Sequence, residues 1–243
     1  MASVIKSFFS RDFEYSPFHR VLEILAILGF FVLVGIIAVR VAIGFSAYGW
    51  TTALWVVPLT ALVGYLAADL VSGIVHWLGD TYGTEETPVL GDNFIKPFRD
   101  HHVEPEGICH HDFVEVNGNN SIVLALYMVP VAIFLSDPTQ IWQFLFLSGS
   151  IFFTLGIFMT NQFHKWSHEP DPPGYIRTLQ KWHLILPSDH HDVHHTAPFD
   201  TYYCITVGWM NPILQRLQIL EGIERMLKSV FGIRTARDQN EAV

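Results

Sequence analysis

The chain has 243 residues, of which 50% are hydrophobic and only 15% are charged, whereas soluble domains usually carry about 25% charged residues. This deficit of charge indicates that much of the surface does not face water. The formal charge of −9 argues against a nucleic-acid partner, because binding to phosphates requires a basic face. The two cysteines, Cys109 and Cys204, form no CxxC pair and no disulfide framework, which favours a reducing compartment.

Four hydrophobic runs are long enough, or nearly long enough, to cross a bilayer, which takes about 20 apolar residues. The third run is short and contains Pro130, so it is either a span or a tilted or re-entrant helix. The pattern predicts an all-α protein with a single domain, 1–243, built as a four-span transmembrane helical bundle. The expected spans are about 21–39, 50–78, 121–135 and 139–163.

Basic residues predict the orientation of these helices in the membrane. Lys and Arg are found before the first run, between the second and third runs, and after the fourth run. The other two connections carry no Lys or Arg beyond Arg40, which ends the first run. By the positive-inside rule, the N-terminus and a histidine-rich helical cap, formed by 80–120 and 164–231, therefore face the cytosol.

The last part of this cap, residues 211–231, repeats apolar residues at helical spacing after Asn211-Pro212, a typical helix start. We expect a single helix here. It either packs on the rest of the cap or lies in the plane of the membrane.

Histidine is the most over-represented residue, with 13 copies against 14 Lys and Arg together. All 13 fall in segments predicted to be cytosolic or at the cytosolic end of a span. An ionisable group at the end of an apolar helix, such as His76, is costly unless it is paired or binds a metal. Four elements stand out: His76 with Asp80, the pair His101 and His102, His164 with His168, and His191 with His194 and His195.

The number of these histidines indicates two metal ions rather than one. Neutral imidazole binds Zn, Cu, Fe and Ni, and eight imidazoles supply about four ligands for each of two ions. The chain has no HExxH motif, which argues against a zinc metalloprotease, and it lacks the Glu-rich pattern of soluble di-iron bundles. A twin-metal, histidine-rich site at a membrane predicts oxygen activation at iron and oxidation of a lipid alkyl chain.

Six ordered motifs carry a resemblance to a known family. DLVSGIVHWLGDTYG, FIKPFRDHHVEPEGI, HDFVEVNGNN, NQFHKWSH, LPSDHHDVHH and YYCITVGWMN resemble the motifs of the plasmanylethanolamine desaturases, over about 60–225. The plant plastid palmitate desaturase is a more distant relative. The resemblance implies a non-haem di-iron (two Fe2+) enzyme of the membrane. It would use O2 to convert the sn-1 alkyl ether of plasmanylethanolamine into the vinyl ether of a plasmalogen.

The resemblance also implies partners and a location. Electrons would come from a separate protein, cytochrome b5-like or ferredoxin-like, and the site would face the cytosol at a bacterial inner membrane or the endoplasmic reticulum. The alternative is a fatty acyl or sterol desaturase or hydroxylase with the same di-metal site. A metal transporter is disfavoured, because Asp69 is the only acid well inside a predicted span.

Residue roles follow from spacing and from the resemblance together. The family motifs place a catalytic role on Asp80, either as a ligand or, preferably, as a hydrogen-bond partner of a ligand. His110 departs from the family and is left out. His111, His183 and His190 are interpreted as groups that orient ligands, or as possible ligands. The predicted metal ligands are His76, His101, His102, His164, His168, His191, His194 and His195.

Two further interpretations concern polar and aromatic residues near the membrane surface. Asp112, Glu115 and Asn117 either contact a lipid head group or belong to a capped loop with a turn at Asn117-Gly118. The aromatic residues are interpreted as an interfacial belt. They are Trp77, Trp166, Trp182, Tyr202 and Tyr203.

Overall fold

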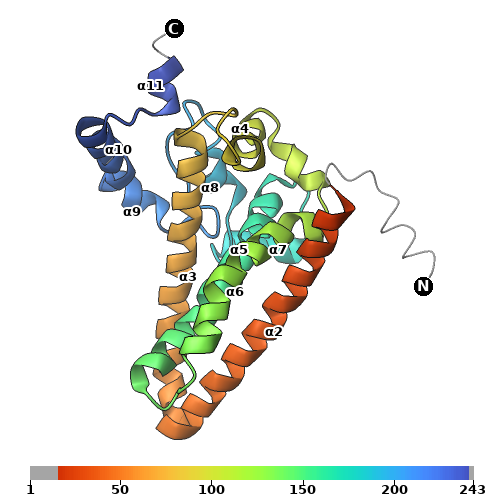
Figure 1. The fold of residues 1–243 in the computed structure, drawn as a ribbon, viewed down its shortest axis with the longest axis vertical. Coiled ribbons are helices and arrows are strands. Elements are labelled where there is room, and N and C mark those ends of the chain that lie inside the picture. The colour runs from red at the N-terminus through yellow and green to blue at the C-terminus, as the bar shows by residue number, and fades with distance from the viewer. Residues whose placement is uncertain (1–15, 241–243) are drawn as a thin grey trace, which may run out of the picture.

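The computed structural model describes residues 16–240, and this part of the chain consists of helices and loops without a strand. The prediction of an all-α fold is therefore confirmed. Four long helices run along the length of the molecule, and the short helices gather at one end (Figure 1). Each of the four is long and apolar enough to cross a membrane. They are α2 (Pro17–Tyr48), α3 (Trp50–Thr81), α5 (Phe113–Phe134) and α6 (Ile141–His168).

The start of α5 is set by a capping box. The Asp112 carboxylate accepts the backbone N–H groups of Val114 at 2.9 Å and Glu115 at 3.1 Å, and the Glu115 side chain accepts the N–H of Asp112 at 2.8 Å. The expected cap at this point is thus present. The expected turn at Asn117-Gly118 is wrong, because both residues are buried within α5.

The helices pack as two close pairs, α3 with α6 and α2 with α5. Small residues allow the first pair to approach. A Cβ atom on Gly64 would lie 2.4 Å from the carbonyl oxygen of Gly149, and one on Gly156 would lie 2.6 Å from the Cβ of Ala68. Close approach through small residues is how membrane helices gain van der Waals contact without help from the hydrophobic effect.

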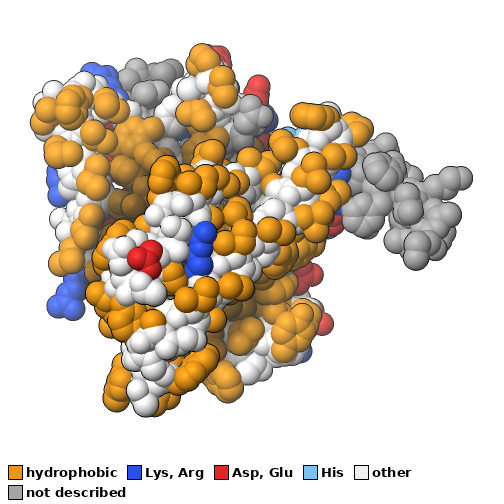
Figure 2. Space-filling model, turned by 60° about the horizontal axis from the view of Figure 1, so that its bottom comes forward, with side chains coloured by type: hydrophobic (Ala, Val, Ile, Leu, Met, Phe, Trp, Pro, Cys, Tyr) orange, Lys and Arg blue, Asp and Glu red, His pale blue; other side chains and the backbone are white. Residues whose placement is uncertain are grey.

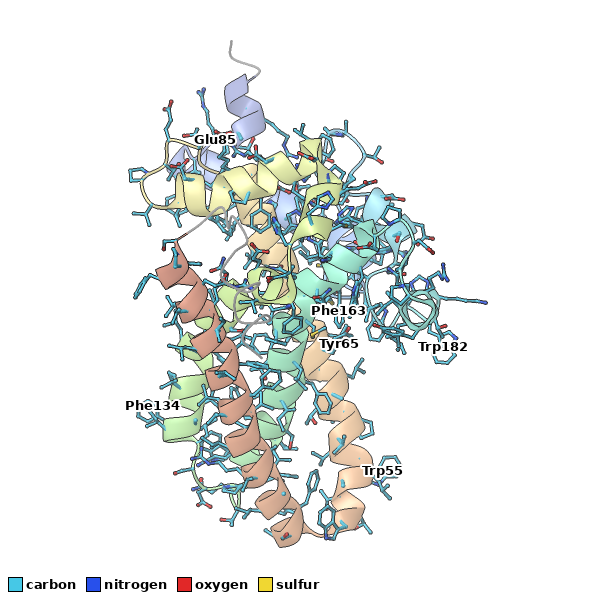
Figure 3. The ribbon with its side chains drawn as sticks, turned by 90° about the vertical axis from the view of Figure 1, so that its right-hand side faces the viewer. Trp55, Tyr65, Glu85, Phe134, Phe163 and Trp182 are labelled. Carbon is cyan, nitrogen blue, oxygen red and sulfur yellow. The ribbon has the colours of Figure 1, made fainter. Side chains whose placement is uncertain are left out.

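The outer surface of the four long helices is apolar. Figure 2 shows hydrophobic side chains spread over this part of the molecule with few charged ones among them. Trp55 is 80% exposed and Phe134 75%, and both point away from the bundle (Figure 3). An exposed apolar area of this extent is unfavourable in water and suits a hydrocarbon solvent. The chain is therefore a membrane protein.

The short helices form a cap at the end of the bundle where α3 and α6 end (Figure 1). Two short turns, η1 and η2, flank α4. The helices and turns of the cap are η1 (Gly91–Ile95), α4 (Lys96–Val103), η2 (Pro105–His110), α7 (Gly174–Lys181), α8 (Ser188–Asp192), α9 (Asn211–Arg216), α10 (Ile219–Phe231) and α11 (Ala236–Asn240).

The structure of the cap differs from two predictions made from the sequence. The single helix expected over 211–231 is divided, because Gln218 adopts a left-handed conformation with φ of 48° between α9 and α10. The aromatic belt is also wrong in part, since Trp77 and Tyr203 are 4% and 3% exposed. Trp77 is buried because α9 and α10 fold back onto the end of α3, whereas Trp182 is 66% exposed.

Candidate metal centre

Five imidazoles converge where the cap meets the end of α6. The i and i+4 spacing places His164 and His168 on one face of the last turns of α6. Their Nε2 atoms are 3.2 Å apart, and the Nε2 of His101, from α4, lies 3.0 Å from that of His168. His191 and His195 complete the group, with Nε2 atoms 3.1 Å apart. All five potential ligand atoms lie within 4.8 Å of one another, and we call this cluster the five-histidine group.

A second cluster lies beside it, at the end of α3. It contains three imidazoles and the Asp80 carboxylate, all with ligand atoms within 4.8 Å of one another. The Oδ2 atom of Asp80 lies 3.3 Å from the Nε2 of His76, 3.6 Å from that of His102 and 3.5 Å from that of His194. We call this cluster the three-histidine group.

Backbone carbonyls fix the protonation of two imidazoles in the three-histidine group. The Nδ1 atom of His76 lies 3.1 Å from the carbonyl oxygen of Tyr203, and that of His194 lies 2.8 Å from the carbonyl oxygen of Thr201. A carbonyl oxygen only accepts, so both Nδ1 atoms must donate and carry the proton. In the neutral imidazole the Nε2 atom then holds a lone pair, which is free to bind a metal.

The positions of these atoms show whether the three-histidine group suits a metal ion. The Nε2 lone pair of His76 faces an oxygen of Asp80, which is also an acceptor. Among the described residues, neither that Nε2 nor either Asp80 carboxylate oxygen has a hydrogen-bond partner, although all three atoms are buried. Buried acceptors that face one another are costly unless a cation lies between them. Nitrogen donors with one carboxylate suit a divalent transition metal, so the residues fit such an ion.

The electrostatics of the cap histidines agree with this fit. Burial and, to a smaller extent, the neighbouring His168 and His195 lower the pKa of His101 to about 2. Burial likewise lowers the pKa of His102 and His194 to about 4 and that of His195 to about 3. These imidazoles are therefore neutral near pH 7, which is the form that binds a metal.

The carbonyls that orient His76 and His194 belong to a loop, residues 201–210, that lies along α3. Asp69, fully buried in α3, accepts three backbone N–H groups of this loop, those of Val207 at 2.9 Å, Gly208 at 2.8 Å and Met210 at 2.9 Å. Ser72 and Asn211 add further contacts, because Ser72 accepts the N–H of Ile205 and Asn211 bonds both backbone groups of Cys204. Asp69 thus positions the loop and, through it, the two imidazoles.

The predicted site residues therefore fall into three classes. The eight predicted ligands and Asp80 all lie in the two groups. His190 lies in neither, and its Nε2 donates to the carbonyl oxygen of Gly208 at 3.0 Å. His111 and His183 are exposed and lie in neither group. The loop 201–210 was missed as part of the site, because it contributes backbone carbonyls, which no residue-type pattern reveals.

Comparison of the sequence with known proteins shows the family to which this chain belongs. Residues 65–238 match the model of the lipid desaturase domain. The chain is 44% identical over 226 residues to the plasmanylethanolamine desaturase of Myxococcus xanthus, covering 92% of this chain and 77% of that protein. It is 40% identical over 186 residues to plasmanylethanolamine desaturase 1 of Mus musculus, covering 75% and 69%.

A plant protein is also similar. The chain is 32% identical over 178 residues to the chloroplastic fatty acid desaturase 4 of Arabidopsis thaliana, covering 72% of this chain and 53% of that protein. No solved structure matches. Both histidine groups and Asp69 lie inside the range that the domain model matches. The chain therefore belongs to the lipid desaturase family and is a membrane-bound oxidoreductase that acts on a lipid.

Proposed function

We propose that this protein introduces the vinyl-ether double bond into the sn-1 alkyl chain of plasmanylethanolamine and so forms a plasmalogen. The main support is its 44% and 40% identity to two proteins named plasmanylethanolamine desaturase. The reaction removes one hydrogen from each of the first two carbons of the alkyl chain, counted from the ether oxygen. Together with two external electrons and two protons, these hydrogens reduce O2 to two molecules of water.

The two histidine groups are proposed to hold one iron ion each. The five-histidine group would bind one ion. His76, His102, His194 and Asp80 would bind the other. The short distances from Asp80 to all three Nε2 atoms favour a ligand role for its carboxylate over the hydrogen-bonding role expected from the sequence. When bound, the iron pair supplies the oxidising power that removal of hydrogen from an unactivated C–H bond requires.

The chain itself supplies orientation and exclusion of water. His76, His191 and His194 are at most 1% exposed, so water has little access to the centre of the site. A dry site suits the chemistry, because it protects a strongly oxidising centre from side reactions. The groups lie at the ends of α3 and α6, two of the helices long and apolar enough to cross the bilayer in which the alkyl chain of the substrate is dissolved.

The proposal includes a side of the membrane and a partner. The distribution of Lys and Arg supports a cytosolic location for the two groups, at either a bacterial inner membrane or the endoplasmic reticulum. The electrons are proposed to come from a separate cytochrome b5-like or ferredoxin-like protein, which would dock on the exposed cap.

The test is an assay on membranes that contain the full chain. They are supplied with a 1-O-alkyl ethanolamine phospholipid, O2 and a reduced donor protein of either class, and the acid-labile vinyl ether is measured. We expect product with the wild type and none with His164→Ala. The matched control is His183→Ala, which removes an exposed imidazole outside both groups and should retain activity. Desaturation of an acyl lipid without any vinyl ether would instead establish the acyl alternative.

A further inference from the structure

The outer face of α10 is apolar and uncovered in the structure. Ile219 is 40% exposed, Met226 50% and Val230 64%, and their i, i+7 and i+11 spacing places them on one face of the helix. Polar side chains such as Arg225 and Ser229 occupy the other face. An apolar face of this kind requires a partner, because it is unfavourable in water.

The position of α10 indicates what that partner is. Leu214 and Leu220 pack on Trp77 of α3, and the Trp77 indole donates to the Glu224 side chain at 2.7 Å. These contacts hold α9 and α10 against the cytosolic end of α3 (Figure 1). On that part of α3, other positions are apolar and exposed, namely Ile74 at 37%, Val75 at 40% and Leu78 at 41%. Exposed apolar positions of α3 thus lie beside the position at which α10 contacts this helix.

Charge supports the same partner. Three exposed arginines lie in α10 or close to its ends in the chain, namely Arg216, Arg225 and Arg234. Figure 2 shows hydrophobic side chains with Lys and Arg at their edge in the corner where α9 and α10 lie. An apolar face with a basic border is typical of helices that lie at the level of the lipid head groups, where the cations meet phosphates.

We propose that α10 is an in-plane helix that buries Ile219, Met226 and Val230 in the lipid surface at the histidine-rich end of the bundle. Of the two alternatives that the sequence leaves open for this segment, the structure favours the membrane. The contact with Trp77 joins this helix to α3 one residue away from His76. The proposal concerns the lipid surface alone and does not depend on which lipid is the substrate.

The four long helices hold the chain in the bilayer in any case, so sedimentation with vesicles does not test this proposal. Local accessibility does. The full-length, metal-loaded protein is reconstituted in vesicles of phosphatidylcholine and phosphatidylglycerol, in a Cys109→Ser background that keeps the buried Cys204. A nitroxide label is attached at Met226→Cys or Val230→Cys. Arg225→Cys and Ser229→Cys are the matched controls on the polar face.

The measurement compares collisions of each label with O2, which concentrates in lipid, and with a water-soluble nickel chelate. We expect the ratio of O2 to nickel accessibility to be several-fold higher at 226 and 230 than at 225 and 229. Ratios at 226 and 230 as low as those of labels in water would place this face of α10 in water and overturn the proposal. Spin–spin broadening that disappears when labelled protein is diluted with unlabelled protein would overturn it too, because a second copy would then cover the face.

A second measurement needs no label. Val230→Glu places a charge in the proposed lipid contact, and Ser229→Glu places the same charge one residue away, about 100° around the helix and on its polar side. In vesicles, hydrogen–deuterium exchange of the α10 amides should be several-fold faster in Val230→Glu than in the wild type, with Ser229→Glu unchanged. Wild-type exchange in Val230→Glu would contradict a lipid contact at this position.

Discussion

The carboxylate of Asp69 accepts the backbone N–H of Gly208 at 2.8 Å, although the two residues are 139 positions apart in the chain. A buried acid in an apolar helix is costly unless it is fully hydrogen-bonded, and the loop 201–210 satisfies this acid with three backbone donors. The same loop presents carbonyls to His76 and His194. The acid and the proposed metal ligands are therefore mechanically connected.

Asp69→Asn should loosen this loop, since the amide has one oxygen to accept hydrogen bonds and an NH2 group that faces backbone donors. We expect the free energy of unfolding to fall by roughly 3 kcal/mol, the cost of leaving buried donors unpaired. Metal should also be lost at a lower temperature than in the wild type. Metal release and helix content are followed during heating in detergent. Asp171→Asn, which changes an exposed acid outside both histidine groups, is the control, and equal behaviour of the two variants would refute the role of Asp69.

His191→Ala should reduce metal binding strongly, because it removes one member of the five-histidine group. His183→Ala should leave metal content unchanged, because His183 is exposed and outside both groups. Elemental analysis of purified protein checks both, with about two irons per chain expected for the wild type. If His191→Ala retained the wild-type metal content, the imidazole would not be a ligand.

Asp80→Asn tests the three-histidine group separately. The variant keeps the shape of the side chain but removes the only carboxylate of the group, so one of the two ions should be bound more weakly. We expect metal content to drop from about two ions to about one per chain after dialysis. Asp171→Asn removes an exposed acid and serves as the control. Loss of both ions would instead show that the two groups bind metal cooperatively.

The cap of α5 predicts a dependence on pH. Burial tends to raise the pKa of Asp112, but hydrogen bonds from Arg20 and from the amides of Glu115 and Val114 hold it below its usual value. Because the folded pKa is lower than the unfolded one, the carboxylate stabilises the fold above about pH 4. This contribution is lost as the pH falls further.

The corresponding variant is Asp112→Asn. At pH 7 it should unfold roughly 2 kcal/mol more easily than the wild type, because asparagine still caps the helix but no longer offers a charged acceptor to the Arg20 guanidinium. The difference should shrink as the pH falls below about 4, because the wild-type acid then also loses its charge. Chemical unfolding of both proteins at several pH values measures this difference in stability. A difference independent of pH would contradict a role for the charge of Asp112.

Glycines in the long helices should respond in opposite directions to the same change. Gly64→Ala should weaken the contact of α3 with α6, because its Cβ would lie 2.4 Å from a backbone oxygen. Gly35→Ala should be neutral or stabilise α2 by up to about 1 kcal/mol, since nothing lies within 4 Å of its Cβ. Thermal unfolding in the same detergent compares them, and destabilisation by both would show that Gly35 also faces a partner.

Much of this architecture could be predicted from the sequence. Long apolar runs are direct consequences of the thickness of the bilayer, so the all-α fold was predictable. The candidate ligands could be identified from the sequence because so many histidines are rare in one chain and because their spacing suits metal binding. The helix α5 was harder to delimit, because its polar first turns depend on the capping box at Asp112 rather than on hydrophobicity.

The division of the histidines into two groups was not predicted. His101 and His102 are adjacent in sequence but lie in different groups, as do His194 and His195. Neighbouring residues in a helical segment point about 100° apart, so each adjacent pair serves two centres at once. The role of Asp69 was also out of reach, because its partners are backbone groups far away in the chain, and no local pattern marks them.

The potential ligands come from four separate stretches of the chain, from α3, α4, α6 and the region of α8, that lie between His76 and His195. These stretches leave the ribosome at different times. An ion that binds donors from several of them would join segments that are far apart in the chain. The hydrophobic helices have all they need to enter the membrane before any metal arrives, whereas the buried acceptors of the cap that face one another are stabilised when an ion lies between them. We therefore expect metal acquisition to be the last stage of biogenesis, and chains made during iron starvation to persist as inserted but open precursors that are vulnerable to proteolysis.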